Sequence, residues 1–572
     1  MTTAESPASG AAPIAGPAGS AASGAGPGEE RPAAGAGELS RRWAWAGLAA
    51  VLAGGLGLRL WGIGQGLPYA YNADEADHFV VHAVEMFAEG TLNPHYFANP
   101  PAYTYVLHFL FAAWLGGGAA VKHAFGADPT EVYTLARVAA AVLGTIALWL
   151  LYATGARLFG RGVGLLAAAI EAVAFLPVFY SHLALNDVPT LAPATLSLLG
   201  SAGVLRSGRP REYVVAGVGL GLACASKYTA GIVLLPFAAA AAARYLDASV
   251  ELGSARAGRR ALGGIALAGV SASAAFLIAN PYAALDYADF HAELAHQSTL
   301  SAEAQGKLGA PKGGGLEYYL WTLTWGLGWA PALAALGGAL SVFGRERVLG
   351  WLLVPAPCAY LLFMGLQGRY FGRWLLPIFP ILCLLAAFFV VQLIVLARRR
   401  LARARVAWAA PLVAALLVAA LLAQGLIYSV HSGKALARAD TRNIARAWMV
   451  AHIPAGARIV VEPVAPDAWG RGWKKYPSLW SHVSASGKLE PGFTKEVGIE
   501  DYERTLAPAL VGYYQRAGYC WVIGGSTESG RAYADPGEVP LAIAYYKALA
   551  RAGKIVFEAS PYARARTAVK FN

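Results

Sequence analysis

Residues 374–405 read WLLPIFPILCLLAAFFVVQLIVLARRRLARAR, an uncharged apolar run that ends in five arginines. About 20 apolar residues at 1.5 Å per residue cross the roughly 30 Å of hydrocarbon in a bilayer. Arginines that follow such a run are typical of the cytoplasmic end of a membrane helix. The stretch therefore predicts a transmembrane helix over 374–396 whose C-terminal end lies in the cytoplasm.

The whole chain has the composition of a membrane protein. Its 572 residues are 57% hydrophobic and 14% charged, whereas soluble domains have about 25% charged residues. The net charge of +12 comes largely from short arginine clusters between apolar runs, so we expect no nucleic-acid partner. The four cysteines show no paired spacing, which argues against both a disulfide framework and a zinc site.

Eleven apolar runs predict about eleven membrane spans, at residues 43–63, 134–155, 162–182, 189–206, 212–226, 229–245, 261–279, 322–343, 348–366, 374–396 and 406–428. The arginine clusters fall on one side if residues 101–118 form a helix in the outer interface rather than a span. This topology puts the N-terminus in the cytoplasm and predicts a multi-pass protein of a bacterial-type cytoplasmic (inner) membrane.

Three regions follow from this topology. We expect residues 1–40 to be a disordered cytoplasmic tail. We expect residues 41–428 to form a helical membrane domain with long outer loops at 64–133 and 280–321. Residues 429–572 predict a small extracytoplasmic α/β domain. Its expected elements are a helix at 440–452, strands at 458–462 and 519–524, a helix at 540–550 and a strand at 554–558.

Candidate acids lie at the outer ends of spans. Asp74 and Glu75 come shortly after the first span, where partial desolvation suits a carboxylate to general-base catalysis. Asp187 lies on the same predicted side, at the outer end of the third span. The alternatives are ordinary ones: two acids at a helix start, and a cap for the helix that begins near Pro189.

Three cations break the cytoplasmic arginine pattern. Lys227, Arg369 and Arg373 lie on the predicted outer side. Cations in such places are candidates for function, and a lipid phosphate is a natural partner for them. The alternative is that their side chains reach outward to the lipid headgroups.

The second outer loop carries acids and histidines without a compact metal motif. These are Asp286, Asp289, His291, Glu293 and His296. No pair has the spacing of a motif such as HExxH. We therefore expect no metal or other cofactor, although a divalent ion stays open, and we expect an interfacial helix whose His291 and His296 contact substrate.

In this order, the motifs resemble the GT-C glycosyltransferases of the protein O-mannosyltransferase and aminoarabinose transferase type. The motifs that carry the resemblance are Asp74-Glu75, Asn99-Pro100-Pro101-Ala102-Tyr103, Leu185-Asn186-Asp187, Ser226-Lys227-Tyr228, Arg373-Trp374-Leu375-Leu376-Pro377 and Asp440-Thr441-Arg442. The sequence departs from the pattern of the aminoarabinose transferases at Asn99, where they have lysine, and at Trp374, where tyrosine is usual. The segment after Glu75 also lacks their arginine.

The resemblance implies inverting transfer of a sugar from a polyprenyl-phosphate monosaccharide to an outer-face acceptor, which is a lipid, glycan or protein. Asp74 would be the general base, with Glu75 beside it, and Asp187 would orient a substrate. Arg373, Lys227 and Arg369 would hold the donor phosphate. His78, Asn99 and Tyr103, which lie in or beside these motifs, are candidate substrate contacts.

Three other functions stay open. A transporter or flippase would show paired repeats and ionisable groups deep within its spans, and the sequence shows neither clearly. A lipid-linked oligosaccharide ligase differs in needing more than a monosaccharide donor. A non-catalytic assembly scaffold would tolerate the loss of the Asp74 carboxylate.

Overall fold

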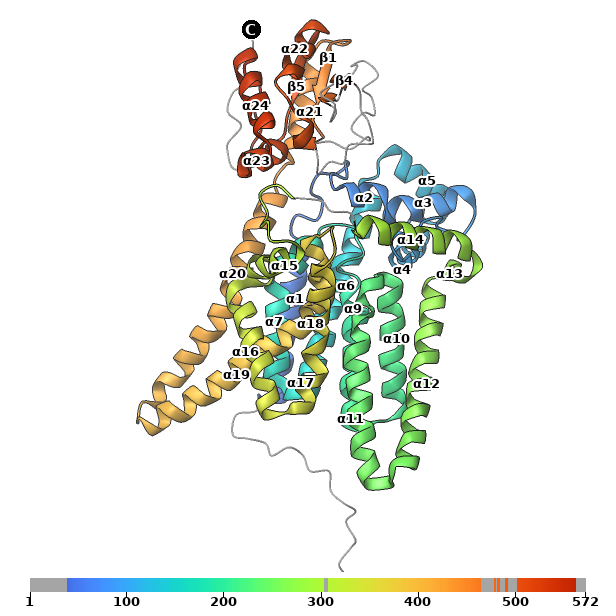
Figure 1. The fold of residues 1–572 in the computed structure, drawn as a ribbon, viewed down its shortest axis with the longest axis vertical. Coiled ribbons are helices and arrows are strands. Elements are labelled where there is room, and N and C mark those ends of the chain that lie inside the picture. Colours follow the sequence, from blue (N-terminus) through green and yellow to red (C-terminus); the bar gives the residue numbers. More distant parts are fainter. Residues whose placement is uncertain are drawn as a thin grey trace, which may run out of the picture. The chain divides into compact units, whose positions relative to one another are not determined.

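The computed structural model describes residues 39–302, 307–463 and 502–561, and the backbone of three short strands between 478 and 491 (Figure 1). Within these ranges, eight helical stretches are long and apolar enough to cross a membrane, or nine if one bent pair counts as a span. They are Arg41–Leu60, Thr130–Phe159, Tyr228–Leu252, Ser254–Ala279, Gly315–Arg345, Arg347–Gly365, Gly372–Arg403 and Ala407–His452. The chain is a polytopic α-helical membrane protein, as predicted.

All eleven predicted spans coincide with helices. Eight correspond to the stretches above, which comprise α1 (Arg41–Leu60), α6 (Thr130–Phe159), η1–α11 (Tyr228–Leu252), α12 (Ser254–Ala279), α15–α16 (Gly315–Arg345), α17–α18 (Arg347–Gly365), η3–α19 (Gly372–Arg403) and α20 (Ala410–Leu436) with its flanking turns. The other three are α7 (Arg161–Val173, continued by α8, Phe175–Tyr180), α9 (Leu191–Ser207) and α10 (Pro210–Ser226). These helices have 13, 17 and 17 residues, so they are short for a span. The exact number of spans stays a prediction.

Gly372–Arg403, which contains the predicted span 374–396, is the most deeply packed of the eight stretches. In its 18-residue apolar window, 67% of the residues are buried within the protein, compared with 11% in that of α12. Its side chains join the largest apolar cluster, together with residues of α7, α9 and α16. We infer that α19 is the central helix of the membrane domain, whereas α12 turns most of its surface outward.

Helix α10 is in very close contact with both α9 and α12, and Figure 1 shows α9 to α12 running side by side. Glycines make this approach possible. A Cβ at Gly219 would collide with the backbone of Ser197 on α9, and a Cβ at Gly221 would collide with the backbone of Ala272 on α12. Small residues at such interfaces allow membrane helices to pack through dispersion forces. The backbone of α10 therefore packs directly against the backbones of α9 and α12 near Gly219 and Gly221.

The first predicted outer loop is helical. It contains α2 (Ala73–Asp77), α3 (Phe79–Glu89), α4 (Ala102–Leu115) and α5 (Gly118–Ala127). Helix α4 occupies the predicted interfacial segment and meets α5 at 95°, which makes the pair a broken span or a re-entrant loop. Buried side chains of α3, α4 and α6 form a separate apolar cluster that supports this loop.

The second predicted outer loop packs on the first. It contains α13 (Tyr282–Leu285) and α14 (Tyr287–Ala302), and α14 has no fully buried residue. The Glu293 carboxylate accepts hydrogen bonds from the backbone N–H groups of Phe97 and Ala98, the latter at 2.7 Å. Asn93 donates its side-chain amide to Asp286 at 2.7 Å. These bonds fix α14 beside the segment that leads into α4.

The described part of the C-terminal region is an α/β unit. A parallel sheet in the order β2-β1-β5 joins β1 (Arg458–Val461), β2 (Ser478–Leu479) and β5 (Tyr519–Ile523), and β3 (Ser481–Val483) pairs antiparallel with β4 (Leu489–Pro491). The helices are α21 (Thr441–His452), α22 (Ala509–Arg516), α23 (Ser526–Ala534) and α24 (Pro540–Ala552). Ile459 packs with α21, and the next residue, Val460, packs with α22 and α24. Helices therefore cover both faces of β1, as in other parallel sheets.

One boundary and one element of this region differ from the predictions. Helix α20 continues to Leu436, so the predicted border at 428/429 lies inside a helix. Residues 554–558 form no strand, and their backbone pairs with no strand of the described sheet. Phe557 instead stacks on Trp448 at a ring distance of 5.0 Å, so this apolar residue packs against α21 rather than extending the sheet.

Candidate active site

Four charged side chains from distant parts of the sequence meet at one place. Asp74 comes from α2, Asp187 from the turn before α9, Lys227 from the end of α10, and Arg373 from the 3-10 helix η3 (Gly372–Ile378). The arginine pattern of the sequence predicts that all four lie on one side of the membrane. Their convergence is compatible with that topology.

The four residues form a continuous row of alternating charge, here called the charge row: Asp74, Arg373, Asp187 and Lys227. Arg373 forms an ion pair with Asp74, and its Nε lies 3.3 Å from Asp187 Oδ2. Asp187 also pairs with Lys227. The side chain of Asp74 is 34% exposed and that of Asp187 only 4%, so the row runs from an accessible acid to a buried one.

Local structure explains how Asp74, Asp187 and Lys227 are held. Asn72 caps α2 by accepting the N–H of Glu75 at 3.2 Å. The side-chain amide of Asn186 donates to the carbonyl of Ser226 at 2.6 Å, which ties the loop of Asp187 to the end of α10. There Lys227 leaves the helix with an extended backbone, at φ −157° and ψ 119°. The row is therefore fixed by neighbouring backbone as well as by its own ion pairs.

Glu75, predicted beside Asp74 as a catalytic acid, lies in a different environment. Both Glu75 and Arg137 are completely buried, and two 2.7 Å hydrogen bonds join them. Glu75 Oε1 also accepts the N–H of Ala184 at 2.7 Å. Both carboxylate oxygens are engaged and inaccessible, which favours a structural role for Glu75; a catalytic role stays a prediction. Glu75 connects α2, α6 and the loop before Asp187.

Arg137 is a residue that the sequence analysis missed, and its guanidinium also donates to the carbonyls of Ile63 and Gln65, at 2.9 and 2.7 Å. A charged residue inside the predicted span 134–155 was the available signal, because such residues are normally paired. Arg59 is a second case. It is fully buried near Glu171 and donates to the carbonyls of Gly55 and Ala172.

Positive charge gathers around Phe371, next to the charge row. The Arg373 guanidinium lies 4.7 Å from the centre of the Phe371 ring, Arg369 lies at 5.9 Å, and Lys307 Nζ at 3.6 Å. Arg373 is also 5.8 Å from the ring of Tyr180. Arg369 and Arg373 therefore lie against the same ring, and Lys307 is an additional cation there that the sequence analysis did not single out.

An aromatic group lies beside α2. His78 stacks on Tyr96 at a ring distance of 5.2 Å, and His82 stacks on the same ring at 4.5 Å. The side-chain amide of Asn99 donates to the Tyr96 hydroxyl at 2.6 Å. Burial lowers the pKa of His78 against the opposing effect of Asp74, which favours the neutral imidazole. His78 and Asn99 therefore belong to one cluster, whose centre is Tyr96.

The other predicted substrate contacts, Tyr103, His291 and His296, lie outside the Tyr96 cluster. Tyr103 is buried, and its hydroxyl donates to the carbonyl of Ala136 at 2.6 Å, which gives it a structural role. His291 and His296 are exposed on α14. Contact between substrate and these two histidines stays a prediction.

One group of side chains has ligand atoms close enough to share a metal ion. His95, Asp286 and Asp289 bring one atom each within 4.8 Å of one another. The group contains both aspartates of the second loop, but His95 of the first loop takes the place of His291 and His296. Asp286 already accepts a hydrogen bond from Asn93. This is a possible oxygen and nitrogen ligand set for a divalent ion.

Comparison with known proteins supports the predicted family. Residues 130–275 match the family described as dolichyl-phosphate-mannose-protein mannosyltransferase. The matched segment extends from α6 into α12 and includes Asp187 and Lys227. No curated protein matches the sequence. The family match confirms the predicted resemblance and the predicted enzyme class, a membrane glycosyltransferase.

Similar solved structures include two kinds of glycosyltransferase. The oligosaccharyltransferase of Archaeoglobus fulgidus in its apo form is 14% identical, with a TM-score of 0.49 over 88% of this chain and 72% of that chain. ArnT from Cupriavidus metallidurans bound to undecaprenyl phosphate is 13% identical, with a TM-score of 0.47 over 91% of this chain and 97% of that chain. At these low scores, neither likeness by itself assigns a substrate to this chain.

Proposed function

We propose that this membrane glycosyltransferase transfers a sugar, with inversion, from a polyprenyl-phosphate monosaccharide to an acceptor on the non-cytoplasmic face of a bacterial-type cytoplasmic membrane. The observation that carries the proposal is the charge row. It combines an accessible carboxylate with two cations at one end of the helices, and inverting transfer from a phosphate needs both.

The cations suit the departing phosphate. A phosphate leaving group gains negative charge as its bond to the anomeric carbon breaks, and preorganised positive charge stabilises that state. Arg373 offers a planar guanidinium that can bind two phosphate oxygens, and Lys227 offers a compact ammonium. Arg369 and Lys307, both close to Phe371, add positive charge to the approach.

Asp74 suits the general base. Inversion requires the acceptor to attack the anomeric carbon from the side opposite the phosphate, so the base and the phosphate site must be distinct groups. Asp74 is the most exposed member of the charge row. It would take the proton from the acceptor hydroxyl as the new glycosidic bond forms and the bond to phosphate breaks.

Donor binding would also prepare the base. In the structure, Arg373 is paired with Asp74. A donor phosphate competes for the same guanidinium, so its arrival releases the Asp74 carboxylate towards the acceptor. Asp187 would keep Arg373 and Lys227 in place during this exchange, because it contacts both. Asp187 is therefore proposed as a positioning residue.

The location of the reaction follows from the predicted topology. All four members of the charge row lie at predicted outer ends, and the C-terminal α/β unit follows α20 on the same predicted side. The N-terminus would be cytoplasmic. The acceptor is proposed only as an outer-face lipid, glycan or protein, because the charge row recognises a phosphate and a hydroxyl rather than a particular acceptor.

The first test uses purified protein in lipid with a panel of radiolabelled polyprenyl-phosphate monosaccharides. Wild type should release or transfer one sugar, and Asp74→Asn should not. Asp77→Asn, on the same short helix and outside the charge row, is the matched control and should retain activity. Turnover by Asp74→Asn at the wild-type rate would overturn the assignment of the base.

A lipid-linked oligosaccharide ligase and a flippase remain the alternatives. If only lipid-linked oligosaccharides support transfer, the enzyme is a ligase. If labelled lipid crosses the bilayer without release of sugar, the flippase interpretation replaces transfer.

A further inference from the structure

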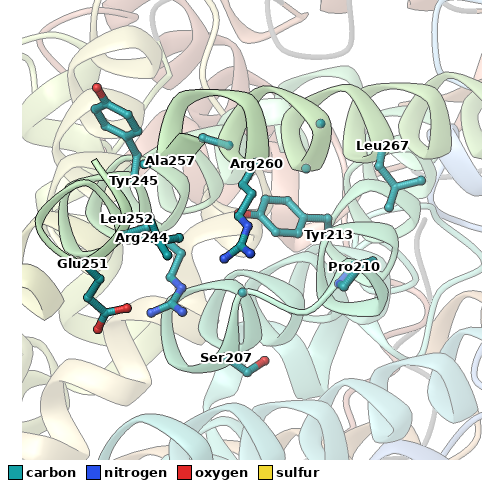
Figure 2. Close-up of a pocket in the computed structure, with 15 residues that line it drawn as sticks. Ser207, Pro210, Tyr213, Arg244, Tyr245, Glu251, Leu252, Ala257, Arg260 and Leu267 are labelled. Atoms are coloured by element: carbon teal, nitrogen blue, oxygen red, sulfur yellow. The ribbon is translucent and has the colours of Figure 1, made fainter. Parts of the chain in front are cut away.

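A second polar site lies at the ends of α9 and α10 that are farther from the charge row. A cavity of about 430 Å³ opens where α9 ends, α10 begins, α11 (Leu234–Leu252) ends and α12 begins. Its lining includes Ser207, Pro210, Tyr213, Arg244, Glu251 and Arg260 (Figure 2). Asp187 and Lys227 of the proposed active site lie at the other ends of α9 and α10, so the cavity is a separate site.

Two arginines dominate the charge of this cavity. Figure 2 shows the guanidinium groups of Arg244 and Arg260 extending into the space between the helices. Within the described parts of the chain, neither forms an ion pair with a carboxylate. Glu212, the nearby acid on α10, is already bound by Arg157 at 2.8 Å and by Arg211 at 3.2 Å.

The backbone adds to this positive charge. Helix α10 begins with Pro210 in the cavity wall, and the N-terminal end of a helix carries partial positive charge that favours anions. Arg244 lies against Gly208, where a Cβ would come within 2.6 Å of its Nε. The residue at this turn has φ +59°, so glycine satisfies both the backbone and the space that Arg244 needs.

The surface beside the cavity is apolar, which suits a lipid better than a dissolved ion. Large apolar side chains on the same helices are exposed, namely Leu246 and Val250 on α11 and Leu262 and Ile265 on α12. In the 18-residue apolar window of α12, only 11% of the residues are buried within the protein. A ligand here could place a negative head between the arginines while its apolar chains lie along α11 and α12.

We propose that this cavity binds the phosphate headgroup of an anionic membrane lipid in the leaflet opposite the active site. Helices α9 and α10 each have 17 residues, which separates their ends by about 25 Å at 1.5 Å per residue. The two sites therefore lie near opposite surfaces of the bilayer. Basic pockets between membrane helices on the cytoplasmic side are suited to anionic lipids.

The test measures lipid retained by the full-length protein. Protein from membranes containing equal amounts of phosphatidylglycerol and phosphatidylcholine is analysed by native mass spectrometry. Wild type should retain phosphatidylglycerol, and Arg244→Gln with Arg260→Gln should reduce that retention by about tenfold or more, since two charged hydrogen-bond donors are lost.

The matched control removes the same charge from the same end of the bundle. Arg256 and Arg259 are exposed on α12 and lie outside the cavity lining. Replacing both with glutamine should leave retention unchanged. Equal losses in the two double variants would overturn the site in favour of diffuse attraction. If the cavity variant does not fold, Glu251→Gln serves instead and should raise retention, because it removes negative charge from the lining; unchanged retention would contradict the proposal.

Inorganic phosphate distinguishes the two sources of the ligand. Phosphate at rising concentration should displace no more lipid than chloride of equal ionic strength. Loss of most of the retained lipid to phosphate, at a concentration where chloride displaces none, would show that the free anion is the preferred ligand and would overturn the lipid assignment.

Discussion

Asp74 and Glu75 are adjacent in the sequence, yet their carboxylates bind different arginines. Asp74 pairs with Arg373, 299 residues away, in a partly exposed site. Glu75 pairs with Arg137 where both side chains are completely buried. One acid of the pair is therefore accessible for chemistry, and the other holds the surrounding segments together.

Asp74→Asn should abolish transfer while donor binding persists. The amide cannot accept the proton of the acceptor hydroxyl, but Arg373 and Lys227 remain. Because asparagine competes less well than a carboxylate for Arg373, donor affinity should stay the same or increase. Donor titration of the variant in nanodiscs, followed by single-turnover transfer, checks both parts. Loss of donor binding together with transfer would instead make Asp74 a binding residue.

Arg373→Ala should weaken donor binding by about 1.5–3 kcal/mol, the usual scale for a charged hydrogen bond. Arg373→Lys keeps the charge but loses the planar guanidinium, so its affinity should fall between those of the wild type and the alanine variant. Titration with the same polyprenyl-phosphate sugar measures all three proteins. Equal donor affinity in all three would remove Arg373 from the phosphate site.

Glu75→Gln should destabilise the folded protein by about 3–5 kcal/mol, because it leaves the buried charge of Arg137 without its partner. The thermal-unfolding midpoint in detergent should fall accordingly. The double variant Glu75→Leu with Arg137→Met removes both charges and should recover much of the loss. A stable but inactive Glu75→Gln protein would instead favour the catalytic role first predicted for this acid.

The C-terminal unit should lose stability as the pH rises. Burial, with Glu528 nearby, raises the pKa of Glu462 from 4.5 to about 8. Between these values the folded unit holds a proton that the unfolded chain releases, so its stability is fullest below the lower value and falls towards the higher one. Hydrogen-exchange protection factors of β1 and β5 in the full chain should show this decline.

Glu462→Gln should flatten that pH dependence, because glutamine does not titrate. Glu558→Gln, at an exposed position, is the control and should leave the slope as in the wild type. An unchanged slope in Glu462→Gln would assign the effect to other groups, with Glu503 and Glu528 as the first candidates, since burial also raises their pKa values.

Chelation of divalent ions should leave transfer intact, because the charge row supplies both the base and the positive charge. Activity with and without a strong chelator checks this expectation. Complete loss, restored by one divalent ion, would direct attention to His95, Asp286 and Asp289. Asp289→Asn would then be expected to raise the ion concentration that restores activity.

The sequence predicts the members of the charge row better than their pairing. Lys227 and Arg373 stand out because each is a cation on the side where arginines are otherwise rare, and Asp74 and Asp187 end spans on that same side. Which acid meets which cation depends on packing between helices far apart in the chain. Spacing along the sequence contains no information on that choice.

Glu75 and the segment 554–558 show what sequence patterns leave undetermined. The sequence pattern Asp-Glu does not distinguish the two acids. Glu75 is buried by its contact with Arg137 of α6, and that contact arises only in the folded protein. Apolar residues at 555–557 have the composition of a strand, but strand propensity is easily overridden by side-chain packing. Phe557 finds a partner in Trp448 instead.

The close packing of α10 has a practical consequence for protein engineering. Exchanging glycine for alanine inside helices is a common route to more stable variants, because it reduces the conformational freedom of the unfolded chain. That route is closed at Gly219 and Gly221, where an added methyl group would push against neighbouring backbone. Gly263 and Gly269 on α12 have no heavy atom within 4 Å of an added Cβ. Efforts to obtain a more robust enzyme for purification should begin on that outward face.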